Sequence, residues 1–158
     1  VWLAGMDLLD LAAAYVETFD LRRGTSLHLT HYSHGDTRER GMALSALAGS
    51  YRDAGFRVDP CELPDFLPAL LELAAVSTAG AALLSEQRMA LDALQAALAE
   101  AHSGYTTVVA AVCDALPGLT KADRDALRRY RAEGPPSEQV GLEPFAPPEV
   151  LTGGLTHL

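Results

Sequence analysis

The sequence lacks the features that mark disulfide-built, nucleic-acid-binding and membrane-spanning proteins. Among its 158 residues are two cysteines, Cys61 and Cys113, too few for a disulfide framework, so we expect a reducing compartment, the cytoplasm. Its 12 Lys and Arg are outnumbered by 21 Asp and Glu, and the formal charge of −9 argues against binding to a phosphate backbone. No uncharged apolar run is long enough to span a bilayer. We therefore expect no nucleic-acid partner and no membrane insertion.

Aromatic residues are also scarce, and the apolar residues that are present favour helices. Aromatic residues make up 6% of the chain and hydrophobic residues 49%, mostly Ala and Leu, with few of the β-branched runs typical of sheets. The length is that of one ordinary domain. We predict an all-α, single-domain helical bundle over residues 1–134, followed by an irregular tail over residues 135–158 that is rich in proline and glycine.

Apolar residues that recur three and four positions apart predict the individual helices. They cover residues 3–19, 27–34, 37–54, 67–74, 83–98, 105–116 and 121–133. Asp36 with Glu39 has the spacing of a capping box, and so has Thr120 with Asp123. Asp65 is a predicted N-cap for the helix that follows it.

Three histidines at every third position are the only pattern that suggests a metal site, because imidazole is a common ligand for transition metals. His28 and His31 would share one helical face, with Asp36 as a further ligand if the chain turns back. His34 would lie about 600° around the helix from His28 and point away. Polar surface histidines are the simpler interpretation, so we predict no metal site.

Three carboxylates, Glu62, Asp65 and Glu72, are candidates for paired acid and base chemistry. An N-cap and a solvated helix face explain Asp65 and Glu72 more simply. The sequence has no nucleophile elbow, phosphate loop, dinucleotide-binding glycine pattern or zinc-protease motif. Cys113 lies on an apolar face and is expected in the core. We therefore predict that the protein is not an enzyme and has no catalytic residues.

The first third of the chain combines arginines with aromatic residues, the residue types enriched at protein recognition surfaces. These residues are Arg22, Arg23, Arg38 and Arg40 with Tyr15, Phe19, Tyr32 and Tyr51. The alternative is that the aromatic side chains face the core and the arginines are solvated.

Several strings of the sequence are more specific than its composition. Residues 15–23 read YVETFDLRR, and residues 35–41 read GDTRERG. They are followed in order by YRDAGF at 51–56, ELPD at 62–65, EGPP at 133–136 and VGLEPF at 140–145. Together these strings resemble the nitrate reductase molybdenum cofactor assembly chaperones, the NarJ or nitrate reductase delta-subunit family, within the redox enzyme maturation chaperones.

The resemblance implies a compact all-α fold and a system-specific chaperone without a catalytic site. The implied partner is the immature catalytic (alpha) subunit of respiratory nitrate reductase, which is held by its N-terminal peptide in the cytoplasm while the molybdenum cofactor is inserted and the complex is assembled. The cofactor belongs to this client, so the chain is expected to have none of its own. Proteins of molybdenum cofactor biosynthesis are further expected partners. The chaperone is not part of the finished reductase.

The sequence departs from the family pattern at three places. Phe66 follows Leu-Pro-Asp where members commonly have His, so a role of that imidazole does not transfer to this chain. Residues 28 and 31 are often Tyr in members. Members also have another helical stretch before the YVETFD string, so we expect the family's N-terminal helical segment to be missing here.

We predict that the client peptide binds as an amphipathic helix in an apolar groove. The groove is lined by Tyr15, Phe19, Leu27 and Tyr32. The rim, which orients the peptide, is formed by Asp36, Arg38, Arg40, Glu62 and Asp65. The negative net charge attracts a basic peptide and mainly adjusts its rate of association.

Three other interpretations stay open from the sequence. One is a sister chaperone that serves another molybdoenzyme, such as a sulfoxide or amine-oxide reductase. Another is a metal-dependent enzyme, or a metal-binding protein, built on His28, His31 and Asp36. The third is a helical interaction module with a different partner.

Elemental analysis of the purified protein separates the metal-binding protein from the chaperone. We expect no stoichiometric transition metal, because the chaperone interpretation assigns no metal ligands. One metal ion per chain that is lost on replacement of His28 and His31 by Ala would support the metal-binding alternative.

Overall fold

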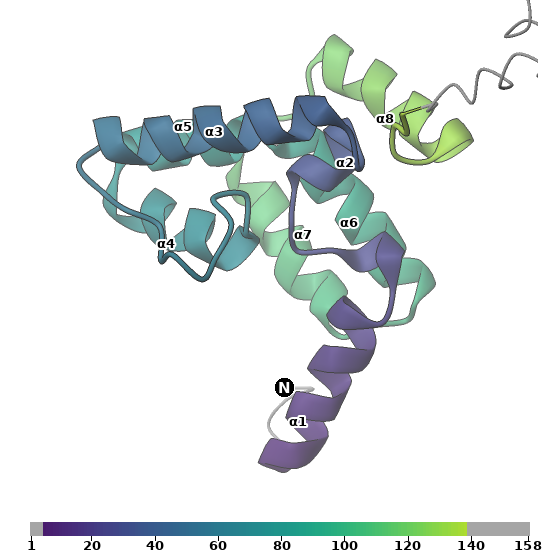
Figure 1. Ribbon diagram of the computed structural model, residues 1–158. Coiled ribbons are helices and arrows are strands. Elements are labelled where there is room, and N and C mark those ends of the chain that lie inside the picture. Colours follow the sequence, from purple (N-terminus) through teal and green to yellow (C-terminus); the bar gives the residue numbers. More distant parts are fainter. Residues whose placement is uncertain (1–4, 139–158) are drawn as a thin grey trace, which may run out of the picture.

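The computed structural model describes residues 5–138. These residues form helices and turns without a β-sheet, although an isolated antiparallel bridge joins His28 and Phe66. The α-helices are α1 (Leu8–Tyr15), α2 (Thr30–His34), α3 (Arg38–Asp53), α4 (Leu67–Val76), α5 (Thr78–Glu86), α6 (Arg88–Glu100), α7 (Tyr105–Ala115) and α8 (Lys121–Glu133). A π-helical turn, η2 (Val16–Asp20), and a 3-10 turn, η3 (Arg23–Thr25), lie between α1 and α2. The predicted all-α fold is confirmed (Figure 1).

Helix α6 lies at the centre of the core. Leu91, Leu94 and Leu98 recur on one of its faces and are fully buried. Helices α2, α5, α7 and α8 all contact α6. Cys113 of α7 is buried in the same cluster, which confirms its predicted place in the core. Burial of each such leucine contributes about 1.5–3 kcal/mol to folding.

The predicted helix over residues 83–98 is wrong as a single element. The chain breaks at Gln87 (φ −87°, ψ 13°), which separates α5 from α6. The two helices have different neighbours, because α5 packs on α4 whereas α6 packs on α7 and α8. Leu84 and Leu91 lie seven positions apart, so the leucine spacing keeps the helical period across Gln87. The break between α5 and α6 therefore could not be seen in the leucine pattern.

Helices α4 and α5 pack against each other at very close range. Ser77 caps α5 by accepting a hydrogen bond from the N–H of Gly80 at 3.4 Å. Gly80 is buried, and a Cβ atom at this position would lie 2.6 Å from the carbonyl carbon and oxygen of Leu73. The interval between the predicted helices 67–74 and 83–98 therefore contains a break at Ser77 and the start of α5, and Gly80 permits the close packing.

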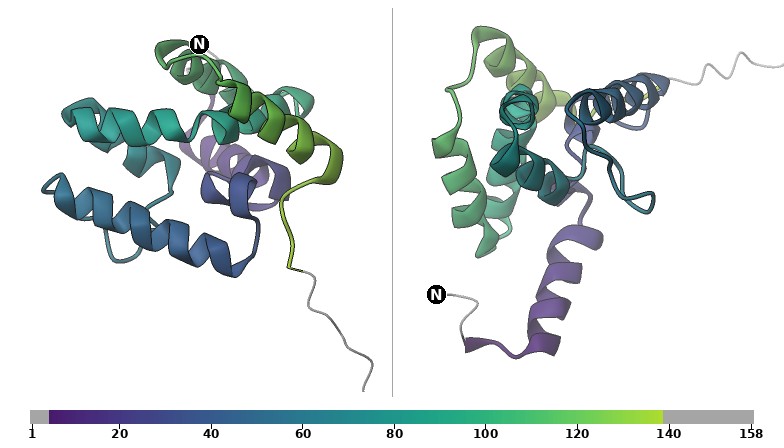
Figure 2. Two further views of the ribbon diagram at one scale, coloured as in Figure 1. Left: turned by 90° about the horizontal axis from the view of Figure 1, so that it is seen from above. Right: turned by 90° about the vertical axis from the view of Figure 1, so that its left-hand side faces the viewer.

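Helix α1 projects from the other helices, as Figure 1 and the right-hand view of Figure 2 show. Asp7 caps it by accepting a hydrogen bond from the N–H of Leu9 at 2.9 Å. None of the residues of α1 is buried, and Leu8 and Leu9 are 86% and 82% exposed. The predicted helix over residues 3–19 is confirmed from Leu8 onward, and it continues into η2, where Phe19 packs against the core.

The other predicted boundaries lie close to the observed ones. Helix α2 begins at Thr30 and is shorter than the predicted segment 27–34. The capping box of Thr120 with Asp123 is present at the start of α8. Residues 135–138, the described start of the predicted tail, are not helical, and residues 139–158 lie outside the described part of the chain. None of the helices within residues 5–138 is long and apolar enough to cross a membrane.

Replacement of Gly80 by Ala tests the contact between α4 and α5. We expect the free energy of unfolding to fall by about 1–3 kcal/mol, because the new methyl group would overlap the Leu73 backbone. Gly41→Ala in α3 is the matched control, since no atom lies within 4 Å of a Cβ there. Alanine favours a helix over glycine by up to ~1 kcal/mol, so the control should be neutral or stabilised. Chemical denaturation measures both, and equal changes would contradict the close packing.

Candidate functional site

The side chain of Asp65 is fully buried and joins two segments of the chain. Its Oδ2 atom accepts hydrogen bonds from the backbone N–H of Thr30 at 3.1 Å and from the Thr30 hydroxyl at 2.5 Å. Its Oδ1 atom lies 3.1 Å from Nδ1 of His28. The backbone carbonyl of Asp65 also accepts from the N–H of Leu29 at 3.1 Å. A buried carboxylate without partners is strongly destabilising, so these donors are what allows Asp65 to be buried.

Arg40 of α3 completes this cluster. Its Nη2 atom lies 3.8 Å from Oδ2 of Asp65, and its Nε donates to the Thr30 hydroxyl at 3.2 Å. Its Nη1 atom is 3.3 Å from Oδ1 of Asp36, which is exposed. The GDTRERG and ELPD strings therefore meet at one buried carboxylate. We call His28, Thr30, Arg40 and Asp65 the Asp65 cluster.

The surroundings of Asp65 set its pKa. Burial raises the pKa, but the hydrogen bonds from His28 and Thr30 outweigh burial and hold it below the ordinary aspartate value. The unfolded chain, with an ordinary aspartate, binds this proton at a higher pH than the folded chain does. The ionised Asp65 therefore stabilises the folded state fully at any pH above the ordinary aspartate pKa. This stabilisation is lost as the pH falls through the lowered pKa of Asp65 in the folded state.

The prediction that Asp65 is an N-cap is wrong. Helix α4 begins after Phe66, whose side chain makes no capping hydrogen bond. The Asp65 side chain turns into the core because Thr30 offers it two donors. Its partners lie far away in the sequence, so the local spacing did not reveal them.

The predicted capping box of Asp36 with Glu39 is also wrong. Asp36 pairs with the guanidinium of Arg40. Thr37, the N-cap residue of α3, makes no capping hydrogen bond with its side chain. The N–H of Arg38 donates instead to Oε1 of Glu138 at 2.7 Å. A side chain at position 35 would overlap the carbonyl of Pro136, so Gly35 lets the start of the tail reach this helix end.

The structure brings Tyr15 and Phe19 together with Tyr105, a residue that the sequence analysis missed. The ring centroids are 5.0 Å apart for Tyr15 and Phe19 and 4.8 Å apart for Phe19 and Tyr105. We call these partly exposed rings the aromatic cluster. Burial, followed by the charge of Asp20, the Tyr105 side chain and the charge of Glu62, raises the pKa of Tyr15. Glu62 therefore lies within electrostatic range of the aromatic cluster.

The other predicted groove residues do not join this cluster. Tyr32 is 1% exposed, and its hydroxyl donates to the carbonyl oxygens of Gly24 and Ser26, both at 3.0 Å. It is therefore a core residue. The sequence did not reveal this, because aromatic residues at helical spacing can face either a groove or the core. Leu27 is partly buried against the core.

The predicted rim residues are divided among three places. Asp65 and the largely buried Arg40 belong to the Asp65 cluster. Asp36 and Arg38 are exposed around the start of α3, and Glu62 is exposed in the loop between α3 and α4. The structure therefore does not form one groove from all of the predicted residues.

The histidines of the predicted metal pattern face different carboxylates. The shortest separations are 3.1 Å for His28 and Asp65, 3.7 Å for His31 and Asp36, and 4.0 Å for His34 and Glu39. Among the described residues, no group of three or more His, Cys, Asp or Glu could hold a metal ion.

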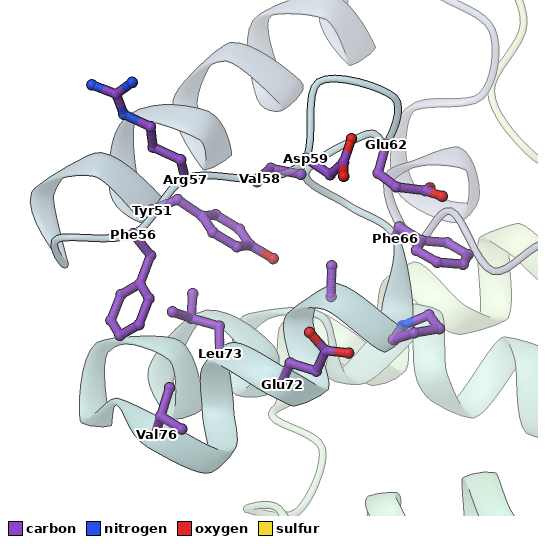
Figure 3. Close-up of a pocket in the computed structure, with 12 residues that line it drawn as sticks. Tyr51, Phe56, Arg57, Val58, Asp59, Glu62, Phe66, Glu72, Leu73 and Val76 are labelled. Carbon is purple, nitrogen blue, oxygen red and sulfur yellow. The ribbon is translucent and has the colours of Figure 1, made fainter.

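A pocket of about 420 Å³ opens beside Glu62, between the loop that follows α3 and helix α4 (Figure 3). Its apolar lining includes Phe56, Val58, Phe66, Leu73 and Val76. Asp59, Glu62 and Glu72 supply carboxylates, and Tyr51 supplies a hydroxyl. Of the carboxylates considered for acid and base chemistry, two line this pocket, whereas Asp65 is buried in its own cluster. Nothing in the sequence spacing connected Tyr51 with this pocket.

Replacement of Asp65 by Asn tests the Asp65 cluster. We expect a loss of about 2–4 kcal/mol at neutral pH, because the amide cannot accept all the hydrogen bonds that the carboxylate accepts. Stability should also fall less steeply toward acid pH than in the parent chain, since the titrating group is gone. Urea denaturation from neutral to acid pH measures both. Asp53→Asn, at an exposed position at the end of α3, is the control and should retain the parent's acid dependence.

Comparison with known proteins places the chain in a family. Residues 2–130 match the nitrate reductase delta subunit family. The chain is 47% identical over 109 residues to the nitrate reductase-like protein NarX of Mycobacterium tuberculosis H37Rv. This aligned region covers 68% of this chain and 17% of NarX. It is also 46% identical over 70 residues to the nitrate reductase molybdenum cofactor assembly chaperone NarJ of Escherichia coli K12. This aligned region covers 44% of this chain and 30% of NarJ.

A further relative is the probable nitrate reductase molybdenum cofactor assembly chaperone NarJ of Bacillus subtilis 168. It is 43% identical over 68 residues, which covers 43% of this chain and 37% of that protein. The chain thus aligns with 17–37% of the length of these three relatives. Because the family match extends over most of the sequence, the chain belongs to the nitrate reductase delta subunit family.

Proposed function

We propose that the chain is an assembly chaperone that holds the N-terminal segment of the immature catalytic subunit of a respiratory nitrate reductase. The observation that carries the proposal is the 46% identity over 70 residues to a protein named as such a chaperone in Escherichia coli. The Asp65 cluster supports it, because two of the strings that resemble this family, residues 35–41 and 62–65, meet there.

The aromatic cluster is the surface that suits the apolar face of a helical peptide best. Its rings contact one another and are partly exposed, so they offer a large and rigid contact area. Helix α1, which ends at Tyr15 of the cluster, exposes Leu8 and Leu9. Peptide helices commonly bind such surfaces through anchors three and four residues apart. We place the client on this surface instead of in one groove that includes Tyr32 and Asp65.

The charges near the aromatic cluster favour a basic peptide. Asp20 and Glu62 both act on Tyr15 electrostatically, and Asp7 and Asp10 are exposed at the start of α1. Exposed carboxylates of this kind increase the association rate of a basic partner and lose this effect at high salt. A peptide that folds on binding loses conformational freedom, so moderate affinity and ready release are expected.

In this proposal the molybdenum cofactor belongs to the client. The chaperone supplies neither a cofactor nor catalytic residues, and it leaves before the reductase is complete. The proteins of molybdenum cofactor biosynthesis act on the client while it is held. The client is held in the cytoplasm, before the complex is assembled.

Calorimetric titration with a peptide of the first residues of the nitrate reductase catalytic subunit tests the proposal. We expect micromolar or tighter binding, roughly −8 kcal/mol. Tyr15→Ala should weaken binding about tenfold, because it removes an exposed aromatic anchor while leaving the core intact. Met42→Ala is the matched control, since Met42 is 67% exposed on α3, away from the aromatic cluster in the fold.

Three results would contradict this assignment. Equal binding of a scrambled peptide would overturn the assignment of the client. No binding of the native peptide by a chain shown to be folded would overturn it too. Tighter binding of a leader peptide from a sulfoxide or amine-oxide reductase would favour the sister chaperone.

A further inference from the structure

Tyr51 presents an unsatisfied hydroxyl group to the pocket beside Glu62. Its side chain is 3% exposed, and its Oη atom is buried without a hydrogen-bond partner among the described residues. Figure 3 shows the hydroxyl directed into the pocket. Burial, followed by the charges of Asp65 and Glu72, raises its pKa to about 12, so the phenol is neutral at physiological pH. Buried polar atoms are nearly always paired with protein or with water, so this hydroxyl is available to a polar group that enters the pocket.

The charge of the pocket is predominantly negative. Asp59, Glu62 and Glu72 line it, and neither glutamate forms a salt bridge with another described residue. Arg57 also lines the pocket, but Figure 3 shows its guanidinium directed away from the hydroxyl of Tyr51. The pocket therefore disfavours carboxylates and phosphates and favours a cation.

The remaining lining suits a planar cation on an apolar stem. Phe56 and Phe66 contribute aromatic rings, and Val58, Leu73 and Val76 contribute aliphatic surface. The pocket measures about 420 Å³, which exceeds the size of a single long side chain. A guanidinium has five N–H donors in one plane and stacks on aromatic rings, whereas an ammonium is a compact and strongly hydrated charge.

We propose that this pocket binds the guanidinium group of an arginine side chain from a peptide partner. The guanidinium donates to the carboxylates of Glu62 and Glu72 and to the Oη atom of Tyr51, and its alkyl stem lies against the apolar wall. The partner is the client segment of the proposed chaperone, so the source of the arginine rests on the proposed function. The chemistry of the pocket does not rest on it.

Titration of the full chain with arginine amide, followed by two-dimensional NMR, tests the pocket itself. We expect saturable shifts of backbone amides around Phe56 and Glu72, with a dissociation constant on the order of 1–10 mM for so small a ligand. Citrulline amide, which has the same shape but no charge, should produce no saturable shifts there. Shifts that are equal for the two amides, or that occur elsewhere in the chain, would overturn the proposal.

Two conservative variants locate the binding. Tyr51→Phe keeps the buried ring and removes only the hydroxyl, and Glu72→Gln keeps the size of an exposed side chain and removes its charge. Each should weaken arginine amide binding at least threefold. Glu133→Gln is the control for the change in net charge, because Glu133 is exposed at the end of α8 and does not line this pocket. Unfolding curves confirm that all three variants are folded.

The client peptide then tests the source of the arginine. Citrulline in place of one arginine should weaken peptide binding at least tenfold to the parent chain, and much less to Tyr51→Phe. If the peptide binds but neither citrulline nor the variants affect it, the pocket proposal is overturned and the proposed function stands. If arginine amide binds in the pocket and the peptide does not bind the chain, the client assignment is overturned and the guanidinium site stands.

Discussion

A carboxylate without access to water has to be surrounded by donors, and in this chain that requirement determines how distant segments meet. The oxygens of Asp65 are paired with the segment before and at the start of α2 and with the guanidinium of Arg40 in α3. The same contacts fix the direction in which the chain enters α4. Removal of one donor would leave a buried charge uncompensated, so these segments are energetically coupled.

The carboxylate of the Asp65 cluster is buried, whereas the two surfaces proposed to bind the partner are at least partly exposed. The core around α6 is closed by leucines with no exposed surface. The aromatic cluster and the pocket beside Glu62 lie outside it; Glu62 lines this pocket and acts electrostatically on Tyr15 of the aromatic cluster. A peptide that placed apolar anchors on the aromatic cluster could therefore place a basic side chain near Glu62 without a change in the core.

Local features of the fold could be predicted from the sequence, because both partners of each interaction lie within one or two helical turns. The capping box of Thr120 with Asp123 and the apolar face that contains Cys113 are of this kind. The break at Gln87 could not be predicted, since it depends on which helices α5 and α6 pack against and not on their own spacing.

The predicted site residues that lie together are close in the sequence, and those that lie apart have distant partners. Tyr15 and Phe19 are four residues apart in one helical stretch, so their contact follows from the period of the helix. Tyr105 completes the cluster from a distant helix, and no pattern within its own segment marks that contact. Tyr32 and Asp65 have the residue types of a binding site, but their burial depends on partners elsewhere in the chain.

The hydrogen bond from the N–H of Arg38 to the carboxylate of Glu138 has a consequence for the order in which the chain folds. It joins residues one hundred positions apart, so it forms only after the segments between them have packed. During synthesis the start of α3 leaves the ribosome long before Glu138 does. The first turn of α3 is therefore completed late, and a chain released before this glutamate is made would keep a frayed end on an otherwise folded helix.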